Sequence, residues 1–294
     1  MTEMGRPPIN RWLPPARSYL IVATARTGSS LLCDYLTSMG CAGKPDEYFS
    51  TVVPRGALQA PSWLEERGRM GPLDYLSLIR ESASTPDATF GAKVNMGGLR
   101  EFLALLRGAF GPHSTDAERI QQAFPGMKVI LLTRLDKVAQ AVSTLKALET
   151  GRLNSLGGEA ARLKLRYSFP LIEMILNDIV AEERALFLMV EKLGLHSRTI
   201  SYEDLSRDPA GAISSVSSFL GLQSNGIVPT TRLRRQSDAV SERWAEKHHH
   251  RKSWVVHRAL LIAGLPTILL QPGLRRYFVS RRSAARQART LGDR

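Results

Sequence analysis

One segment near the start of the chain constrains the fold more than any other. Residues 19–23 (YLIVA) form a short apolar run, which is typical of a buried parallel strand. Residues 24–30 (TARTGSS) are small, polar or basic, and apolar residues then recur at helical spacing over 31–39. The order strand, turn, helix is the repeating unit of an α/β fold with a parallel sheet.

The turn itself has the features of an anion-binding site. The first backbone N–H groups of a helix lack intrahelical acceptors, and together with the positive helix end they favour a phosphate or sulfate. Arg26 adds a fixed positive charge, and Gly28 lets an anion approach the backbone. Hydroxyl donors come from three neighbours, Thr27, Ser29 and Ser30. The alternative is a turn capped by Ser or Thr without a ligand.

The turn differs from the usual nucleotide loop, G-x-x-x-x-G-K-[S/T], because it holds one glycine and no lysine. This difference argues against an ordinary ATPase or kinase. A P-loop-type nucleotide phosphotransferase is still the main enzymatic alternative, and it would be expected to need a loop lysine and acidic metal ligands.

The rest of the chain repeats the alternation of strands and helices. The clearest further strand is 127–133, and others are predicted over 90–94 and 198–202, whereas 50–75 is expected to be an irregular loop. Helices are predicted over 73–82, through 106, through 148, over 160–193 with an interruption near Pro170, and over 210–220. We therefore expect an α/β fold with a P-loop-like parallel sheet flanked by helices.

Arg134 and Ser143 form a second candidate anion site, at a strand end and in the helix that follows. Arginine supplies a planar fork and serine a hydroxyl, which together can bind one phosphate. Taken alone, an exposed arginine and a helical serine are ordinary surface residues. The pair matters because a nucleotide with two separated anionic groups would need two such turns on neighbouring strands.

The composition limits the partners without choosing among them. The formal net charge of +13 favours anionic partners, such as nucleotides, sulfate or phosphate esters, nucleic acids or anionic lipids. The two cysteines, Cys33 and Cys41, match neither a disulfide framework nor a zinc pattern, which indicates a cytoplasmic protein. No signal peptide is predicted in the Pro-rich leader, residues 1–18, and one large domain is expected over 19–252.

Residues 253–294 differ in composition and are expected to form a basic helical tail. They carry eight arginines and one aspartate, so +7 of the +13 lies there. The apolar run 259–270 is shorter than the roughly 20 residues that cross a bilayer. An apolar segment followed by a basic cluster suits peripheral contact with an anionic membrane at its inner face. A helix packed on the core with a basic end is an equal alternative.

Four segments carry a resemblance to a known family. They are ARTGSSLL at 25–32, GCAGKPDEYF at 40–49, LTRLDKVAQAVS at 132–143, and RQSD at 235–238 followed by SERW at 241–244. These segments resemble the bacterial trehalose 2-sulfotransferase family of carbohydrate sulfotransferases. The resemblance implies a single P-loop-like sulfotransferase domain, 3′-phosphoadenosine-5′-phosphosulfate (PAPS) as sulfuryl donor, a carbohydrate acceptor and a tendency to form homodimers.

The same resemblance implies roles for individual residues. It places the 5′-phosphosulfate on residues 26–30 and the 3′-phosphate on Arg134 and Ser143. Glu47 matches the glutamate expected to act as general base, which takes the proton of the acceptor hydroxyl. Arg26 would stabilise the leaving phosphate. The family has a glutamate where this chain has Lys44.

Several further residues have two readings each. Lys93, at a strand end, is either an assisting cation or a solvated lysine. The aromatic side chains that follow Glu47 suit a sugar ring or the core equally: Tyr48, Phe49 and Trp63. No metal site is expected, because consecutive residues such as His248, His249 and His250 point in different directions on a helix.

We therefore expect a PAPS-dependent sulfotransferase that acts on a carbohydrate or glycolipid without a metal and without a nucleic-acid partner. Adenosine 3′,5′-bisphosphate (PAP) is then the second product. The less favoured alternative is a basic nucleic-acid-binding protein. The arginine-rich tail fits that alternative, but the remainder of the chain lacks a nucleic-acid-reading motif.

Overall fold

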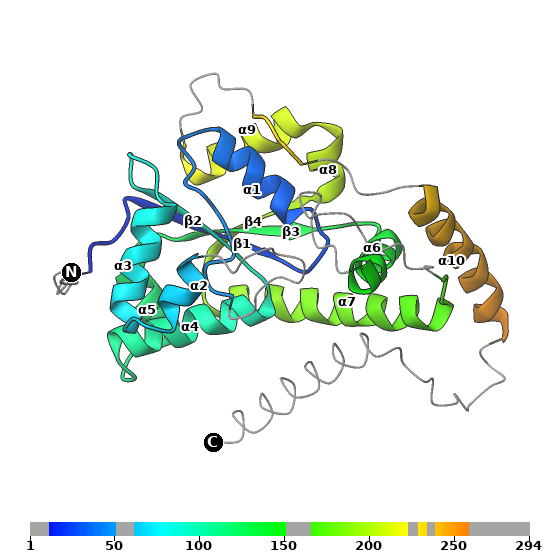
Figure 1. Ribbon diagram of the computed structural model, residues 1–294, viewed down its shortest axis with the longest axis horizontal. Helices are drawn as coiled ribbons and strands as arrows, with labels where there is room; N and C mark the ends of the chain where they lie inside the picture. The colour runs from blue at the N-terminus through cyan, green and yellow to red at the C-terminus, as the bar shows by residue number, and fades with distance from the viewer. Residues whose placement is uncertain (1–11, 51–61, 151–165, 223–228, 234–238, 259–294) are drawn as a thin grey trace, which may run out of the picture.

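The computed structural model describes residues 12–50, 62–150, 166–222, 229–233 and 239–258 (Figure 1). In this part of the chain, the strands form one parallel sheet in the order β2-β1-β3-β4. Their bounds are β1 Arg17–Ala23, β2 Thr89–Val94, β3 Lys128–Thr133 and β4 His196–Ser201. The expected α/β fold is confirmed, and each strand overlaps a segment predicted as a strand.

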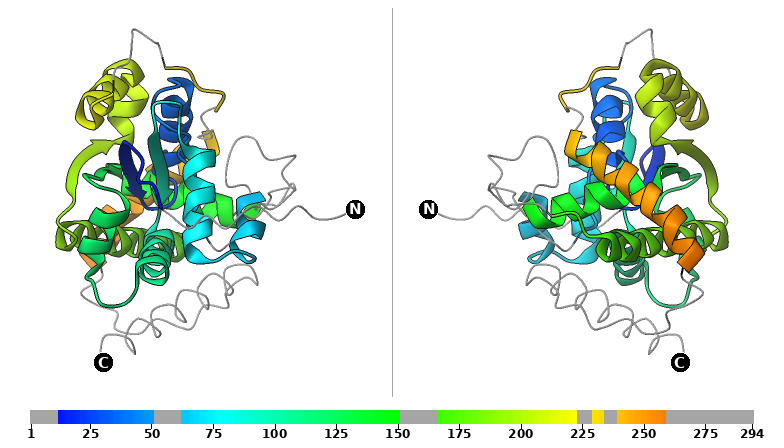
Figure 2. Two further views of the ribbon diagram at one scale, coloured as in Figure 1. Left: turned by 90° about the vertical axis from the view of Figure 1, so that its left-hand side faces the viewer. Right: turned by 90° about the vertical axis from the view of Figure 1, so that its right-hand side faces the viewer.

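Helices cover both faces of the sheet (Figures 1 and 2). One face carries α1 (Ser29–Ser38), α8 (Tyr202–Arg207) and α9 (Pro209–Leu220). The other face carries α3 (Pro72–Ala83), α4 (Met96–Phe110), α5 (Asp116–Ala123) and α7 (Phe169–Lys192). The short α2 (Ser62–Arg67) adjoins α3, while α6 (Lys137–Thr150) packs between α7 and α10 (Ala239–Arg258).

Burial on both faces follows from the alternation of side chains along β1. Leu20 and Val22 point into the cluster shared with α3, α4, α5 and α7. Tyr19, Ile21 and Ala23 point into the cluster shared with α1 and α9. All five side chains are buried, which explains why this strand appears in the sequence as an unbroken apolar run.

Three helices, α2, α5 and α8, lie where no helix is predicted, and α10 begins 14 residues before the expected helical tail. For α5 the signal is present in the sequence, because Thr115 and Glu118 form a capping box. The helix predicted over 160–193 begins at Phe169 in the structure, after the non-helical residues 166–168, while residues 160–165 lie outside the described residues. Pro170 lies in the first turn of α7, where a backbone N–H would have no helical acceptor, so the proline begins the helix.

Near both ends of the chain, the structure describes part of the expected leader and part of the expected tail. Trp12, within the expected leader, packs edge-on against Phe124 and donates from Nε1 to the carbonyl oxygen of Ala123 at 2.9 Å. Residue 253, the expected start of the tail, falls inside α10, whereas residues 259–294 lie outside the described residues. Within the described part, no helix is long and apolar enough to cross a membrane.

Candidate active site

The candidate site residues lie along the carboxyl edge of the sheet. Parallel strands all end at one edge, and ligands of open α/β sheets bind there. Lys93 is the next-to-last residue of β2, residues 24–28 connect β1 to α1, and Arg134 follows β3. Tyr202 begins α8 directly after β4. Each of the four strands thus contributes to one row of residues.

The turn between β1 and α1 presents backbone donors. Arg26 (φ 63°) and Gly28 (φ 83°) adopt left-handed conformations, and Gly28 is the N-cap of α1 without a side-chain cap. The alternative of a turn capped by Ser or Thr is therefore wrong, and the first N–H groups of α1 suit an anion. Thr27 is fully buried and donates to the carbonyl oxygen of Thr24 at 3.0 Å, so its hydroxyl braces the turn.

Gln140 is a site residue that the sequence motifs do not reveal. Its buried amide donates from Nε2 to Thr24 Oγ1 at 2.9 Å and to the Ala25 carbonyl oxygen at 2.7 Å. Because Gln140 belongs to α6, these bonds tie the turn after β1 to the helix after β3. Its spacing of three positions from Ser143 puts both on one helix face, and this spacing is the signal that could have identified it.

Arg26, Arg134 and Ser143 form one cationic cluster. Arg26 Nε donates to Ser143 Oγ at 2.9 Å, and Arg134 Nη1 lies 3.4 Å from the Arg26 carbonyl oxygen. The sequence assigns these residues to two separate anions, whereas the structure brings them together. Burial and the neighbouring Arg134 charge lower the pKa of the Arg26 guanidinium. An anion bound between the two arginines would relieve this repulsion.

The Arg134 guanidinium fits a phosphate or sulfate ligand. Its Cζ lies 4.7 Å from the centroid of the Tyr202 ring, which holds the side chain in place. Its Nε is buried and has no hydrogen-bond acceptor among the described residues. Buried donors are normally satisfied, so a donor of this kind points to a ligand or water.

Glu203, at the start of α8, fixes the turn after β3. Its carboxylate accepts from the backbone N–H of Leu135 at 2.9 Å and of Asp136 at 3.2 Å. These amides are therefore already bonded, which leaves the side chains of Arg134 and, within α6, Ser143 as candidate donors to an anion. No sequence pattern signals this contact, because it joins elements that follow different strands.

On the β2 side of the first turn, Lys93 joins Glu47 to Ser30. Lys93 Nζ lies 2.9 Å from Glu47 Oε1 and 3.2 Å from Ser30 Oγ. Asp46 pairs with Ala92, and its carbonyl oxygen accepts from the Lys93 N–H at 2.9 Å. This pairing returns the chain to the sheet, so Glu47 lies beside the turn.

Lys93 is a charged group inside the site. Its side chain is 11% exposed, so the reading as a solvated lysine is wrong. Burial disfavours the ammonium, but Glu47 and neighbouring acidic groups outweigh burial and raise the pKa of Lys93 above its usual value. Burial also raises the pKa of the nearby Cys33 thiol to about 12, which keeps it neutral.

Other residues considered from the sequence have structural roles or lie outside the described residues. Tyr48 and Phe49 are buried in the core, so they offer no face to a sugar ring. The side chain of Trp63 lies outside the described residues. His248 is buried with its Nε2 2.7 Å from Glu173 Oε1. In the described ranges, no group of three or more His, Cys, Asp or Glu residues could hold a metal ion.

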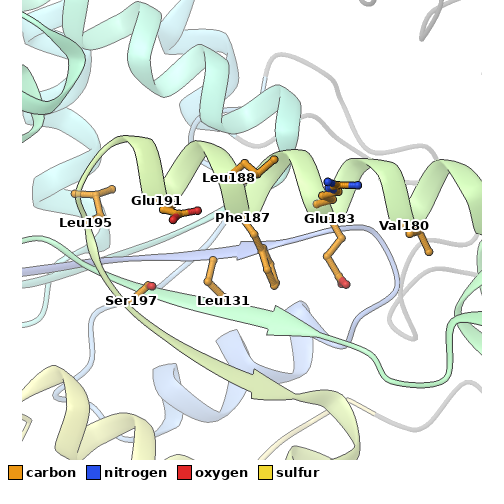
Figure 3. A pocket seen from close by; sticks show the side chains of 9 residues that line it. Leu131, Val180, Glu183, Phe187, Leu188, Glu191, Leu195 and Ser197 are labelled. Carbon is orange, nitrogen blue, oxygen red and sulfur yellow. The ribbon is translucent and has the colours of Figure 1, made fainter.

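A cavity of about 670 Å³ lies beside α7 (Figure 3). It is bounded by α7, β3 and the start of β4. Its lining consists of Leu131, Val180, Glu183, Arg184, Phe187, Leu188, Glu191, Leu195 and Ser197. None of the candidate site residues is among them, although Glu183 accepts from the hydroxyl of Thr133, the residue before Arg134, at 2.8 Å.

A parallel α/β sheet whose carboxyl edge holds guanidinium groups, helix N–H donors and a carboxylate is suited to an enzyme that transfers an anionic group. The chain belongs to the Stf0 sulphotransferase family, whose sequence model matches residues 18–251. The protein is therefore a sulfotransferase, and the family inferred from the sequence motifs is confirmed.

The chain is also similar to individual proteins. The chain is 26% identical over 253 residues to a trehalose 2-sulfotransferase of Mycobacterium tuberculosis, which covers 79% of this chain and 94% of the relative. It is 24% identical over 254 residues to a trehalose 2-sulfotransferase of Mycolicibacterium smegmatis, with the same shares. A solved sulfotransferase from Alicyclobacillus acidocaldarius is 19% identical, with a TM-score of 0.42, and the match covers 83% of this chain and 96% of that one.

Proposed function

We propose that this sulfotransferase moves the sulfuryl group of PAPS to a hydroxyl of a carbohydrate or glycolipid. The observation that carries the proposal is the division of the site by the turn between β1 and α1. Within the turn, Arg26 contacts an arginine and a serine that follow β3, and a lysine and a glutamate lie on the β2 side of the turn. A donor with two anionic groups needs the two arginines and the serine. A reacting hydroxyl needs the carboxylate of the glutamate.

For the donor, residues 26–30 are proposed to bind the 5′-phosphosulfate through the first N–H groups of α1 and the hydroxyls of Ser29 and Ser30. Arg134 and Ser143 are proposed to bind the 3′-phosphate, which would give the buried Nε of Arg134 an acceptor. Arg26 is bonded to Ser143, and its charge would stabilise the leaving phosphate as the S–O bond breaks.

Glu47 is proposed as the general base. The acceptor oxygen attacks sulfur in line with the bond to the 5′-phosphate. The new O–S bond forms as the bond between sulfur and the 5′-phosphate oxygen breaks. The electron pair of the broken bond leaves with PAP. The acceptor proton passes to the Glu47 carboxylate. Because a sulfuryl group carries less charge than a phosphoryl group, the proposed step includes no metal.

The acceptor is proposed from the relatives and the tail. Two relatives are named trehalose 2-sulfotransferases, which supports a carbohydrate acceptor for this chain. A glycolipid would bring its hydroxyl to a membrane surface, where the basic residues 253–294 are proposed to bind anionic headgroups. A homodimer and a cytoplasmic location are further proposals that come from the sequence.

The proposal is tested by incubating the enzyme with radiolabelled PAPS and a glycan or glycolipid extract. We expect labelled product in the wild type and about 10²- to 10⁴-fold less in Glu47→Gln, the range for loss of a general base. Glu81→Gln, which changes an exposed glutamate of α3, is the matched control and should stay active. Equal labelling by Glu47→Gln removes Glu47 from the mechanism, and no labelling by the wild type contradicts the function.

A further inference from the structure

Lys93 lies between the two halves of the proposed reaction. An ammonium group has three N–H donors, and the described residues give it two acceptors, Glu47 Oε1 at 2.9 Å and Ser30 Oγ at 3.2 Å. Ser30 lies in the first turn of α1, where the donor anion is proposed to bind, and Glu47 is the proposed base. One cation therefore touches both the donor turn and the base.

The backbone fixes the position of this cation. Lys93 pairs with Ile21 of β1 on one side, and on the other its N–H donates to the Asp46 carbonyl oxygen. The side chain is 11% exposed, and its raised pKa keeps it charged. A cation this buried requires an anionic partner, and in this structure the partner is Glu47.

A bound sulfuryl group would bring negative charge to the same place. An anion held by the Ser30 hydroxyl and the first N–H groups of α1 comes within reach of Lys93 Nζ, because Ser30 Oγ is already within 3.2 Å of it. The ammonium would then be shared between the sulfuryl oxygens and Glu47. A carboxylate that gives up part of its cationic partner binds a proton more readily.

We propose that Lys93 binds the transferred sulfuryl group and thereby releases Glu47 to accept the acceptor's proton. Without donor, the Glu47 carboxylate is held in the ion pair with Lys93. With donor, the ammonium is shared with the sulfuryl oxygens and stabilises the charge that spreads over them as the S–O bond breaks. Lys93 keeps its proton throughout. The inference rests on the proposed function and adds a coupling between donor occupancy and the base.

The contact with the sulfuryl group is tested by calorimetric titration without acceptor. PAPS and PAP differ only in that group, so their affinities isolate it. In a Glu47→Gln background, Lys93→Met is expected to weaken PAPS binding about tenfold or more and PAP binding less than about threefold, since a charge-assisted hydrogen bond is lost. Lys93→Arg should recover most of the PAPS affinity. Lys192→Met, an exposed site at the end of α7, is the control for lost charge.

The release of Glu47 has a separate readout. Glu47→Gln removes the ion pair, so it should bind PAPS several-fold more tightly than the wild type and bind PAP equally well. Equal PAPS affinity in these two proteins would overturn the release. If Glu47→Gln and the double variant with Lys93→Met bind PAPS equally well, the contact between Lys93 and the sulfuryl group is overturned. Retained PAP binding shows that the double variant is folded. If the wild type binds neither nucleotide, the proposed function has failed instead.

Discussion

Arg134 Nη1 lies 3.4 Å from the carbonyl oxygen of Arg26, although the two residues are 108 positions apart in the chain. The contact follows from the sheet order, because β1 pairs with β3 and the turns after these strands become neighbours. Two anion sites that the sequence presents separately thus share one cluster at the carboxyl edge of the sheet.

Gly28→Ala is expected to destabilise the protein and distort the turn. Gly28 has a φ of 83°, and an added Cβ would lie 2.5 Å from Tyr202 Cδ2. Gly126→Ala is the matched control, because its φ is 66° and its Cβ would meet nothing within 4 Å. The free energy of unfolding in urea should fall further for Gly28→Ala, by at least about 1 kcal/mol, because overpacking adds to backbone strain. Equal losses in the two variants would show that Tyr202 does not restrict this position.

Gln140→Leu is expected to loosen the same turn. The leucine cannot donate to Thr24 Oγ1 or to the Ala25 carbonyl oxygen, and both acceptors would be left without this partner. We expect the free energy of unfolding to fall by about 1–3 kcal/mol, together with weaker binding of PAP. Gln122→Leu, which changes an exposed residue of α5, should alter neither quantity. Full PAP affinity in Gln140→Leu would contradict a bracing role.

The strands and the first turn could be predicted because their signals are local. The apolar run of β1 and the turn at residues 24–30 can be read from neighbouring residues alone. The Lys93–Glu47 pair could not, because it depends on the bridge between Asp46 and Ala92, which only the folded chain creates. The predicted β4 segment, 198–202, is shifted because Tyr202 already begins α8.

Cys33 is expected to resist alkylation in the folded protein. Burial raises the pKa of its thiol to about 12, so the reactive thiolate is scarce at neutral pH. Treatment with iodoacetamide at about pH 8, followed by mass spectrometry of the peptides, should label Cys41 before Cys33, because Cys41 is more exposed. Unfolding in urea should remove the difference. Rapid labelling of Cys33 in the folded state would be inconsistent with the packing of α1 on the sheet.

The preference for PAPS over PAP is expected to be insensitive to moderate alkaline pH. Although burial opposes it, the charge of Glu47 and of neighbouring acidic groups raises the pKa of Lys93 above the ordinary lysine value of 10.5. The ammonium is therefore fully charged below that value, and its contribution is lost only as the pH rises through the raised pKa. The ratio of the affinities for PAPS and PAP, measured by calorimetry between about pH 7 and 10, should therefore stay constant. A steady decline between pH 8 and 9.5 would mean that Lys93 does not supply the preference.

We propose that the turns after β1 and β3 bind the two anionic ends of one nucleotide. The most direct measurement is the calorimetric affinity of the wild type and of Arg134→Met for PAP and for adenosine 5′-monophosphate, which lacks the 3′-phosphate. The wild type should bind PAP at least about tenfold more tightly, and Arg134→Met should lose most of that difference, because a guanidinium–phosphate contact is removed. Arg107→Met, which changes an exposed arginine of α4, should retain it. Equal affinity of the wild type for the two nucleotides would show that the turn after β3 does not bind the 3′-phosphate.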